Sequence, residues 1–309
     1  MFRPAQDFRT LAPYAANWIA PPRTSAPRPW SARVVDPRVG DVLLSGELRD
    51  PANARELYVV LHGLGGTPRS PYCLRTIRAA EKRGAATLAL ALRGADRRGE
   101  DFYNIAQRED VAAALASPEL ARYERIHVIG CSMGGYVALH YARGPVDPRV
   151  RSVAALCTPI DLHAAQRHID TRGAWLYRTH VLNGLKEIYA AVVARGRFAP
   201  SEAREVGRVR TMYEWDRLAI APRYGFESPE AYYRAFSIEP YLARLAVRTL
   251  LVAAEDDPVI PIETIRPFLP KANGPKTNGG ELEVRFVPRG GHLGAGRTFD
   301  EHVLDWCAR

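Results

Sequence analysis

The chain has 309 residues, of which 47% are hydrophobic and 25% charged, a size and composition that fit one large α/β domain with an insertion, or at most two domains. The net charge of +9 would suit a polyanionic partner, but only four of the 43 basic residues are lysine and the arginines are scattered among acidic residues. Because no basic run with interleaved aromatic residues occurs, we expect no nucleic-acid partner.

The first part of the chain, residues 1–32, is rich in proline and arginine, as in Ala26-Pro27-Arg28-Pro29-Trp30. Proline fixes φ and removes a backbone donor, so this composition predicts an extended arm that lies over the surface. A pair of strands is expected next, at residues 33–35 and 41–48.

Short apolar runs then alternate with helical patterns along the chain. Strands are predicted at 56–61, 86–92, 125–129, 151–156, 248–253 and 282–287, and helices at 71–82, 101–116, 133–143 and 300–307. This alternation is typical of a mainly parallel sheet covered by helices on both faces. We therefore predict an eight-stranded sheet of the α/β-hydrolase type, built from residues 33–157 and 246–309.

The alternation is interrupted at residues 158–245, where aromatic residues recur at helical spacing. Ala174-Trp175-Leu176-Tyr177 and the residues after Leu185 are examples. The pattern predicts an inserted helical cap over the carboxyl edge of the sheet. We expect such a cap to form part of any pocket there.

Gly130-Cys131-Ser132-Met133-Gly134 has the G-x-S-x-G form of a nucleophile elbow, a sharp turn that exposes a serine between a strand and a helix. The predicted strand and helix flank it on the two sides. Glycines suit this turn because side chains there would collide with the neighbouring strand and helix. Ser132 is therefore the candidate nucleophile.

A serine hydroxyl needs a base and an orienting carboxylate, which follow it in the order acid then histidine in this fold. His292 follows the last predicted strand and two glycines, so we assign it as the base. Asp257 lies on the loop after the strand at 248–253 and is the favoured acid, with Asp256 second and Glu255 third.

The developing oxyanion needs backbone donors. Met133, the residue after the nucleophile, supplies one amide, and Leu64 in the loop His62-Gly63-Leu64-Gly65-Gly66 is the best candidate for the second. No G-K-[ST] follows this loop, so it does not fit a phosphate-binding loop. We interpret His62 as a structural support rather than a catalyst.

The four cysteines, at 73, 131, 157 and 307, show neither a C-x-x-C pair nor metal-type spacing with histidine. We expect no disulfide framework, no metal site and a cytoplasmic location. No apolar stretch is long enough to span a bilayer, so no transmembrane segment is expected, and peripheral contact of the cap with a membrane stays open.

These features together resemble the YheT-like branch of the α/β-hydrolase superfamily, over about residues 55 to 305. The resemblance is carried by His62-Gly63-Leu64-Gly65-Gly66-Thr67, Arg93-Gly94, the elbow through Gly135, the cap segment from Ala221 to Phe226, Asp256-Asp257-Pro258 and Gly291-His292. The loop at 95–104 and Tyr136, where asparagine is expected, depart from the family pattern. These departures concern the details of the pocket.

The resemblance implies a serine esterase or lipase that acts on acyl esters, including lipid-like ones, without a cofactor. Together with this resemblance, the candidate residues lead us to expect a carboxylic ester hydrolase that forms an acyl-enzyme and takes a hydrophobic small-molecule ester. A thioesterase or amidase using the same residues, and a non-catalytic binding protein of this fold, remain the alternatives.

Overall fold

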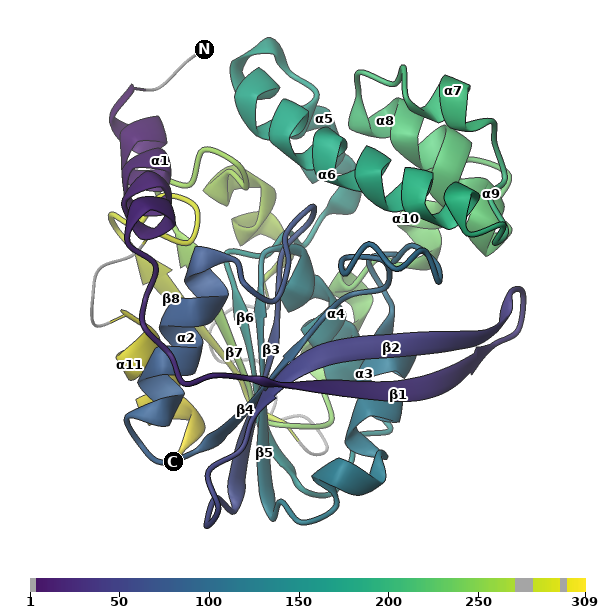
Figure 1. The fold of residues 1–309 in the computed structure, drawn as a ribbon. Helices are drawn as coiled ribbons and strands as arrows, with labels where there is room; N and C mark the ends of the chain where they lie inside the picture. The colour runs from purple at the N-terminus through teal and green to yellow at the C-terminus, as the bar shows by residue number, and fades with distance from the viewer. Residues whose placement is uncertain (1–3, 270–279, 295–298) are drawn as a thin grey trace.

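An eight-stranded sheet forms the centre of the computed structural model, which describes residues 4–269, 280–294 and 299–309 (Figure 1). The spatial order of the strands is β1-β2-β4-β3-β5-β6-β7-β8. Their bounds are β1 (Arg28–Asp36), β2 (Gly40–Arg49), β3 (Glu56–Leu61), β4 (Ala86–Leu90), β5 (Arg125–Cys131), β6 (Val150–Leu156), β7 (Thr249–Ala254) and β8 (Leu282–Val287). Strands β1 and β2 pair antiparallel, β2 meets β4 antiparallel, and β4, β3 and β5 to β8 are parallel. The predicted mainly parallel eight-stranded sheet is confirmed.

Helices cover the sheet on both faces, with α2 and α11 on one side and α3 and α4 on the other (Figure 1). The α-helices are α1 (Pro4–Ile19), α2 (Pro71–Glu81), α3 (Arg108–Leu115), α4 (Met133–Ala142), α5 (Leu162–Ile169), α6 (Trp175–Ala194), α7 (Ala203–Val206), α8 (Met212–Trp215), α9 (Ala221–Tyr224), α10 (Pro229–Ala235) and α11 (Phe299–Cys307). Short 3-10 turns are η1 (Pro118–Leu120), η2 (Arg172–Ala174), η4 (Glu239–Arg244), η5 (Ile262–Thr264) and η6 (Arg266–Phe268), and η3 (Asp216–Ile220) is a π-helical turn.

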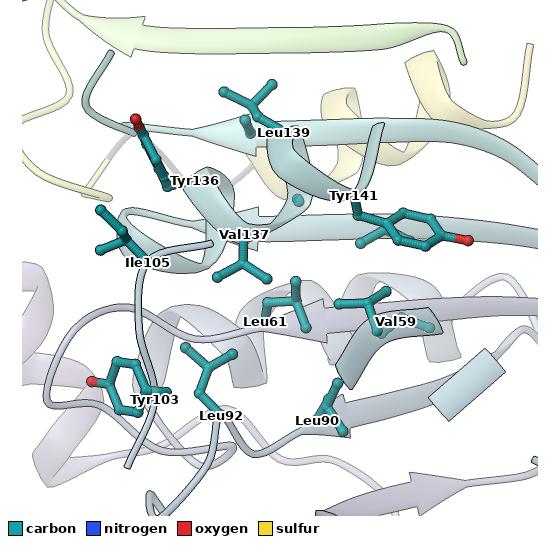
Figure 2. Close-up of a cluster of buried hydrophobic side chains, with 14 of the residues drawn as sticks. Val59, Leu61, Leu90, Leu92, Tyr103, Ile105, Tyr136, Val137, Leu139 and Tyr141 are labelled. Carbon is teal, nitrogen blue, oxygen red and sulfur yellow. The ribbon is translucent and has the colours of Figure 1, made fainter. Parts of the chain in front are cut away.

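The core follows from the side-chain period of the strands. Val59 and Leu61 point to the same face of β3 and pack against Val137 of α4, beside Leu90 of β4 (Figure 2). Every residue of β4 is buried, as expected for a parallel strand covered on both faces. Each such aliphatic side chain contributes about 1.5–3 kcal/mol when fully buried.

Residues 158–245, here called the helical segment, connect β6 to β7 and form a layer over one end of the sheet (Figure 1). Local signals explain two of its boundaries: α9 ends at Gly225 in the left-handed conformation, and the Ser228 hydroxyl caps α10 by accepting the Ala231 amide. Tyr136 of α4, which stands where the family pattern has asparagine, binds this segment through its hydroxyl group. Its hydroxyl donates to the Phe236 carbonyl (2.8 Å) and accepts from the Ile238 amide (3.1 Å).

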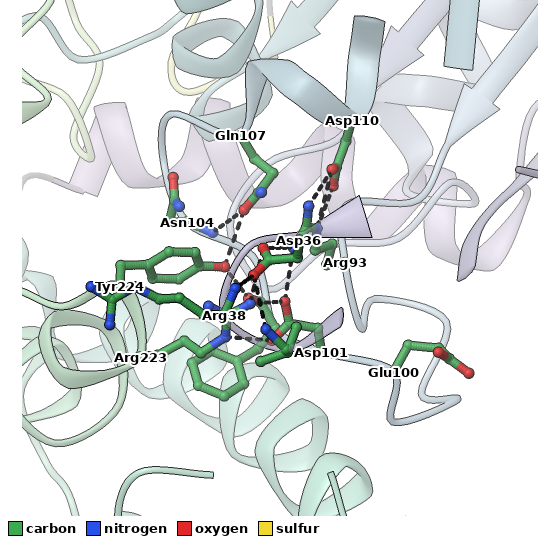
Figure 3. A network of polar contacts seen from close by, with 12 residues as sticks. Asp36, Arg38, Arg93, Glu100, Asp101, Asn104, Gln107, Asp110, Arg223 and Tyr224 are labelled. Carbon is green, nitrogen blue, oxygen red and sulfur yellow. Dashed lines mark hydrogen bonds and ion pairs between the residues drawn. The ribbon is translucent and has the colours of Figure 1, made fainter. Parts of the chain in front are cut away.

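A cluster of buried arginines and aspartates lies where the sheet meets the helical segment (Figure 3). Arg93, after β4, donates to Asp110 of α3 (2.7 Å), to Asp36 at the end of β1 (2.6 Å) and to Asp101 (3.0 Å). Arg223 of α9 contacts Asp101 (2.5 Å) and Asp36 (3.2 Å). Burial raises the pKa of Asp36, but hydrogen bonds from Arg93 and the backbone, with both positive charges, outweigh it and lower the pKa to about 2.

Two predictions about local structure are wrong. The proposed extended arm at 1–32 contains the helix α1. Pro4 at its first position costs no hydrogen bond, although Pro13 lies in its interior, and the proline-rich stretch that follows α1 is the extended part. The predicted helix at 101–116 is only α3. Residues 101–107 are irregular because Asp101 is held by two arginines and the Asn104 side chain accepts the Ala106 amide (2.6 Å), which competes with helical bonding.

Candidate active site

The loops after four parallel strands meet at one edge of the sheet. Ser132 follows β5, the loop that begins at His62 follows β3, Asp257 lies three residues after β7, and His292 lies on the loop after β8. The carboxyl ends of parallel strands share an edge, and crevices there are the usual ligand sites of open α/β sheets. The topology therefore gathers the predicted site residues from across 230 positions of sequence, from His62 to His292.

Ser132 has the strained backbone of an elbow, with φ 52° and ψ −119°. A Cβ on Gly130 would lie 2.1 Å from the Gly134 carbonyl oxygen, and one on Gly134 would lie 2.4 Å from the Leu61 carbonyl oxygen. These contacts explain why both flanking positions hold glycine. Non-glycine residues at positive φ persist only where the surrounding structure imposes them, and such strain clusters at functional sites.

His292 and Asp257 are in direct contact, with 2.8 Å between Nδ1 of the ring and Oδ2 of the carboxylate. The other oxygen of Asp257 accepts the amides of Val259 (2.8 Å) and Ile260 (2.9 Å), which fix the carboxylate on its loop. Asp257 is only 5% exposed. With Nδ1 donating to the carboxylate, Nε2 of His292 is left as an acceptor.

Asp256, the second candidate acid, supports the histidine loop instead. One oxygen accepts the amides of Gly290 and Gly291 (both 2.8 Å), and the other pairs with Arg9 (2.6 Å). Burial raises the pKa of Asp256, but these donors outweigh it and the net pKa is lowered. Glu255, the third candidate, pairs with Arg266 at the surface.

The loop after β3 presents an uncommitted amide at Leu64. The Gly63 amide donates to the Tyr72 hydroxyl (3.0 Å) and the Gly65 amide to the Tyr103 hydroxyl (2.7 Å), so the loop is fixed on both sides. Among the described residues, neither the Leu64 amide nor the Met133 amide has a hydrogen-bond acceptor. Both residues line the same cavity as Ser132.

His62 holds this loop in place through two hydrogen bonds to the backbone. The Leu92 amide donates to its Nε2 (3.1 Å), so the hydrogen resides on Nδ1, which donates to the Gly63 carbonyl (2.8 Å). Burial lowers the pKa of His62 to about 4, and the ring is therefore neutral at physiological pH. Its geometry agrees with the structural role expected from the sequence.

A cavity of about 650 Å³ lies between the sheet edge and the helical segment. Ser132, His292, Leu64 and Met133 contribute to its wall on the sheet side. The helical segment contributes mainly apolar and aromatic residues: Leu162, Ala165, Ile169, Leu176, Val181, Leu185, Met212, Trp215, Ile220, Tyr232 and Tyr233. This size and lining are typical of a site for a small, largely apolar molecule.

Cys157 lies beside the histidine and the acid. Ligand atoms of Cys157, Asp257 and His292 all fall within 4.8 Å of one another. A thiol must lose its proton to bind zinc, but burial raises the pKa of Cys157 to about 12. The His292 Nδ1 atom is also engaged by Asp257, so this set fits a metal poorly.

Helix α1 contributes residues that the sequence reasoning missed. The Thr10 hydroxyl accepts the backbone amide of His292 (2.9 Å), and Arg9 reaches Asp256 beneath the same loop. Thr10 and Leu11 also line the cavity. No motif marks these residues, because their contacts join positions more than 240 residues apart.

All four cysteines are free and buried. Within the three described stretches of the chain, no helix combines the length and apolar character that crossing a bilayer demands.

Comparison with known proteins gives consistent matches. A family model described as the alpha/beta hydrolase fold matches residues 58–294. YheT of Escherichia coli (strain K12), a provisionally named esterase, is 29% identical over 263 residues, which cover 82% of this chain and 75% of the relative. A Saccharomyces cerevisiae protein named medium-chain fatty acid ethyl ester synthase/esterase 2 is 23% identical over 234 residues, 66% of this chain and 51% of the relative.

Solved structures share the fold. The Pyrococcus furiosus esterase Pf2001 superposes with a TM-score of 0.55 at 18% identity, covering 94% of this chain and 95% of its own. Est1E from Butyrivibrio proteoclasticus superposes with a TM-score of 0.53 at 13% identity, covering 90% of this chain and 99% of its own. At these identities the likeness concerns the fold alone.

Proposed function

Because the chain belongs to the alpha/beta hydrolase fold family, with the YheT-like relatives that its motifs predicted, we propose that it hydrolyses carboxylic esters with Ser132, Asp257 and His292. One observation carries the proposal: His292 contacts Asp257 at 2.8 Å and lines one cavity with Ser132, which sits on the strained elbow. The ester hydrolase class agrees with the names of the relatives.

In the proposed reaction, Asp257 holds His292 in the tautomer with hydrogen on Nδ1. The Nε2 atom then takes the proton of the Ser132 hydroxyl as its oxygen attacks the ester carbonyl. The amides of Leu64 and Met133 stabilise the oxyanion, and His292 returns the proton to the leaving alcohol. Water, activated by the same imidazole, hydrolyses the acyl-enzyme and frees Ser132.

The lining of the cavity supports a hydrophobic acyl chain as the preferred substrate. Apolar side chains of the helical segment face a sheet-side wall that carries the reacting groups. The yeast relative is named for medium-chain fatty acid ethyl esters, which agrees with this cavity size. We assign the helical segment, residues 158–245, the role of a cap that excludes water from the bound ester.

Aryl esters of increasing acyl length, assayed with an acyl-CoA in parallel, test the proposal. Ser132→Ala should abolish turnover, whereas Ser31→Ala, an exposed serine on the edge strand β1, should leave it unchanged. A fluorophosphonate should form an adduct on Ser132 that mass spectrometry locates. Hydrolysis that survives Ser132→Ala would refute the mechanism, and a preference for acyl-CoA would instead identify a thioesterase.

A further inference from the structure

The cavity wall contains one carboxylate that the proposed chemistry does not use. Asp216 lies in the helical segment, at the start of the π-helical turn η3, whereas Ser132 belongs to the sheet side of the same cavity wall. Among the described residues it is the only aspartate or glutamate that lines the cavity. A π-helical turn is rare and frequently occurs at functional sites.

Asp216 is buried without a cation. Its side chain is 9% exposed, and no described arginine, lysine or histidine forms an ion pair with it. One oxygen, Oδ2, accepts the Tyr233 hydroxyl of α10 at 2.5 Å, while Oδ1 has no protein partner among the described residues. Taking a carboxyl group out of water is costly unless it is hydrogen-bonded, and Tyr233 satisfies only one of the two oxygens, so the other is left to pair with a ligand in the cavity.

The protonation behaviour of Asp216 matches a neutral polar ligand. Burial raises the pKa of Asp216 to about 7; the Tyr233 hydrogen bond lowers it, and the nearby Asp170 carboxylate raises it further. Near neutral pH the group is thus present both as acid and as carboxylate. A hydroxyl group can accept from the acid and donate to the carboxylate, so it pairs with both forms.

We propose that Asp216 and Tyr233 form a polar subsite for a hydroxyl group on the substrate, remote from the scissile carbonyl. The preferred ester then has an apolar chain that crosses the cavity and carries its hydroxyl near the far end. The remaining wall of the helical segment is mainly apolar, so this subsite selects both for the hydroxyl group and for the chain length that reaches it. The assignment rests on the proposed function, because it takes the elbow side of the cavity as the reacting end.

The test compares p-nitrophenyl esters of ω-hydroxy acids with unsubstituted esters of the same length, from 6 to 12 carbons. The ratio of kcat/KM, hydroxylated over unsubstituted, should peak at one length and fall about tenfold in Asp216→Leu, as expected for loss of one buried hydrogen bond. Tyr233→Phe should lower the ratio less, because Asp216 remains. Tyr213→Phe is the matched control, since this partly exposed tyrosine of α8 does not line the cavity.

A binding measurement separates this inference from the proposed reaction. Calorimetric titration of Ser132→Ala with 8-hydroxyoctanoate and octanoate should show tighter binding of the hydroxy acid, and this preference should vanish when Asp216→Leu is added. Asp216→Ala provides the same comparison if the leucine variant does not fold. An unchanged ratio of kcat/KM in Asp216→Leu, or a preference for the hydroxy acid that persists in that variant, would overturn the subsite, even with esterase activity intact. Preferential binding without any ester hydrolysis would instead refute the proposed function alone.

Discussion

Replacing Arg93 with methionine removes the cation that three buried carboxylates share (Figure 3). Asp36 and Asp101 keep Arg223 as a partner, but Asp110 loses the only cation that contacts it among the described residues. Breaking a buried pair by removing one partner costs about 3–5 kcal/mol. For a chain of this size that corresponds to a fall in Tm of about 5–8 °C.

Thermal unfolding followed by circular dichroism at pH 7.5 measures this loss. Arg93→Met/Asp110→Leu should recover at least half of it, because the orphaned charge is gone and an apolar group fills its place. Arg122→Met is the control: Arg122 pairs with Asp50 at the surface, where such pairs contribute about 0–1 kcal/mol.

The pH dependence gives a second check. Burial raises the pKa of Asp110 to about 6 despite its pairing with Arg93, and loss of the arginine would raise it further. The orphaned carboxyl of Arg93→Met should therefore take up its proton at a pH above 6, so its deficit in Tm should shrink between pH 8 and pH 5. A deficit under about 3 °C at pH 7.5, or no recovery in the double variant, would show that Arg93 does not balance these charges.

Three further predictions concern the site. Asp257→Asn should lower kcat about 10⁴-fold with little change in KM, because His292 is no longer held in the tautomer with hydrogen on Nδ1. Stopped assays over pH 6–9 would measure this loss, and a change in KM alone would contradict the assigned role. Thr10→Val should lower kcat about threefold to tenfold at unchanged KM, with Thr10→Ser restoring it, whereas an effect on Tm alone would mean a merely structural contact. The folded pKa of Asp216 is about 7, against an ordinary value of 3.8. Its contribution to the free energy of unfolding is therefore fully present below pH 4 and is lost as the pH rises to 7. Urea unfolding should show this decline, on the order of a few kcal/mol, and the decline should be absent in Asp216→Asn.

The residues of the proposed site could be named from the sequence because their signals are local. The elbow at Ser132 depends on glycines that would collide with backbone within a few residues, and His292 follows a strand and two glycines. The choice of Asp257 over Asp256 agrees with the observed contact to His292. The short apolar strands that alternate with helical patterns likewise indicate a parallel sheet buried on both faces, so the sheet could be predicted from the sequence alone.

What could not be predicted depends on contacts between distant residues. The helical pattern at 101–107 is overridden because Asp101 pairs with Arg93, which follows β4, and with Arg223 of α9. Proline content suggested an extended arm where α1 forms, since composition does not reveal the docking of Thr10 on the histidine loop. Asp216 has no motif, and only the folded chain shows that it lines the same cavity as Ser132.

Thr10 and His292 are 282 residues apart in sequence, which orders their appearance during synthesis. At about 5–20 residues per second, α1 leaves the ribosome roughly 15–60 s before the histidine loop does. Until then α1 has neither Asp256 nor the histidine loop to pack against, and the cavity lacks the residues that this loop contributes to its lining. The nascent chain therefore carries Ser132 on its elbow before His292, its proposed base, is present, and the complete site geometry forms only after the last strand has paired.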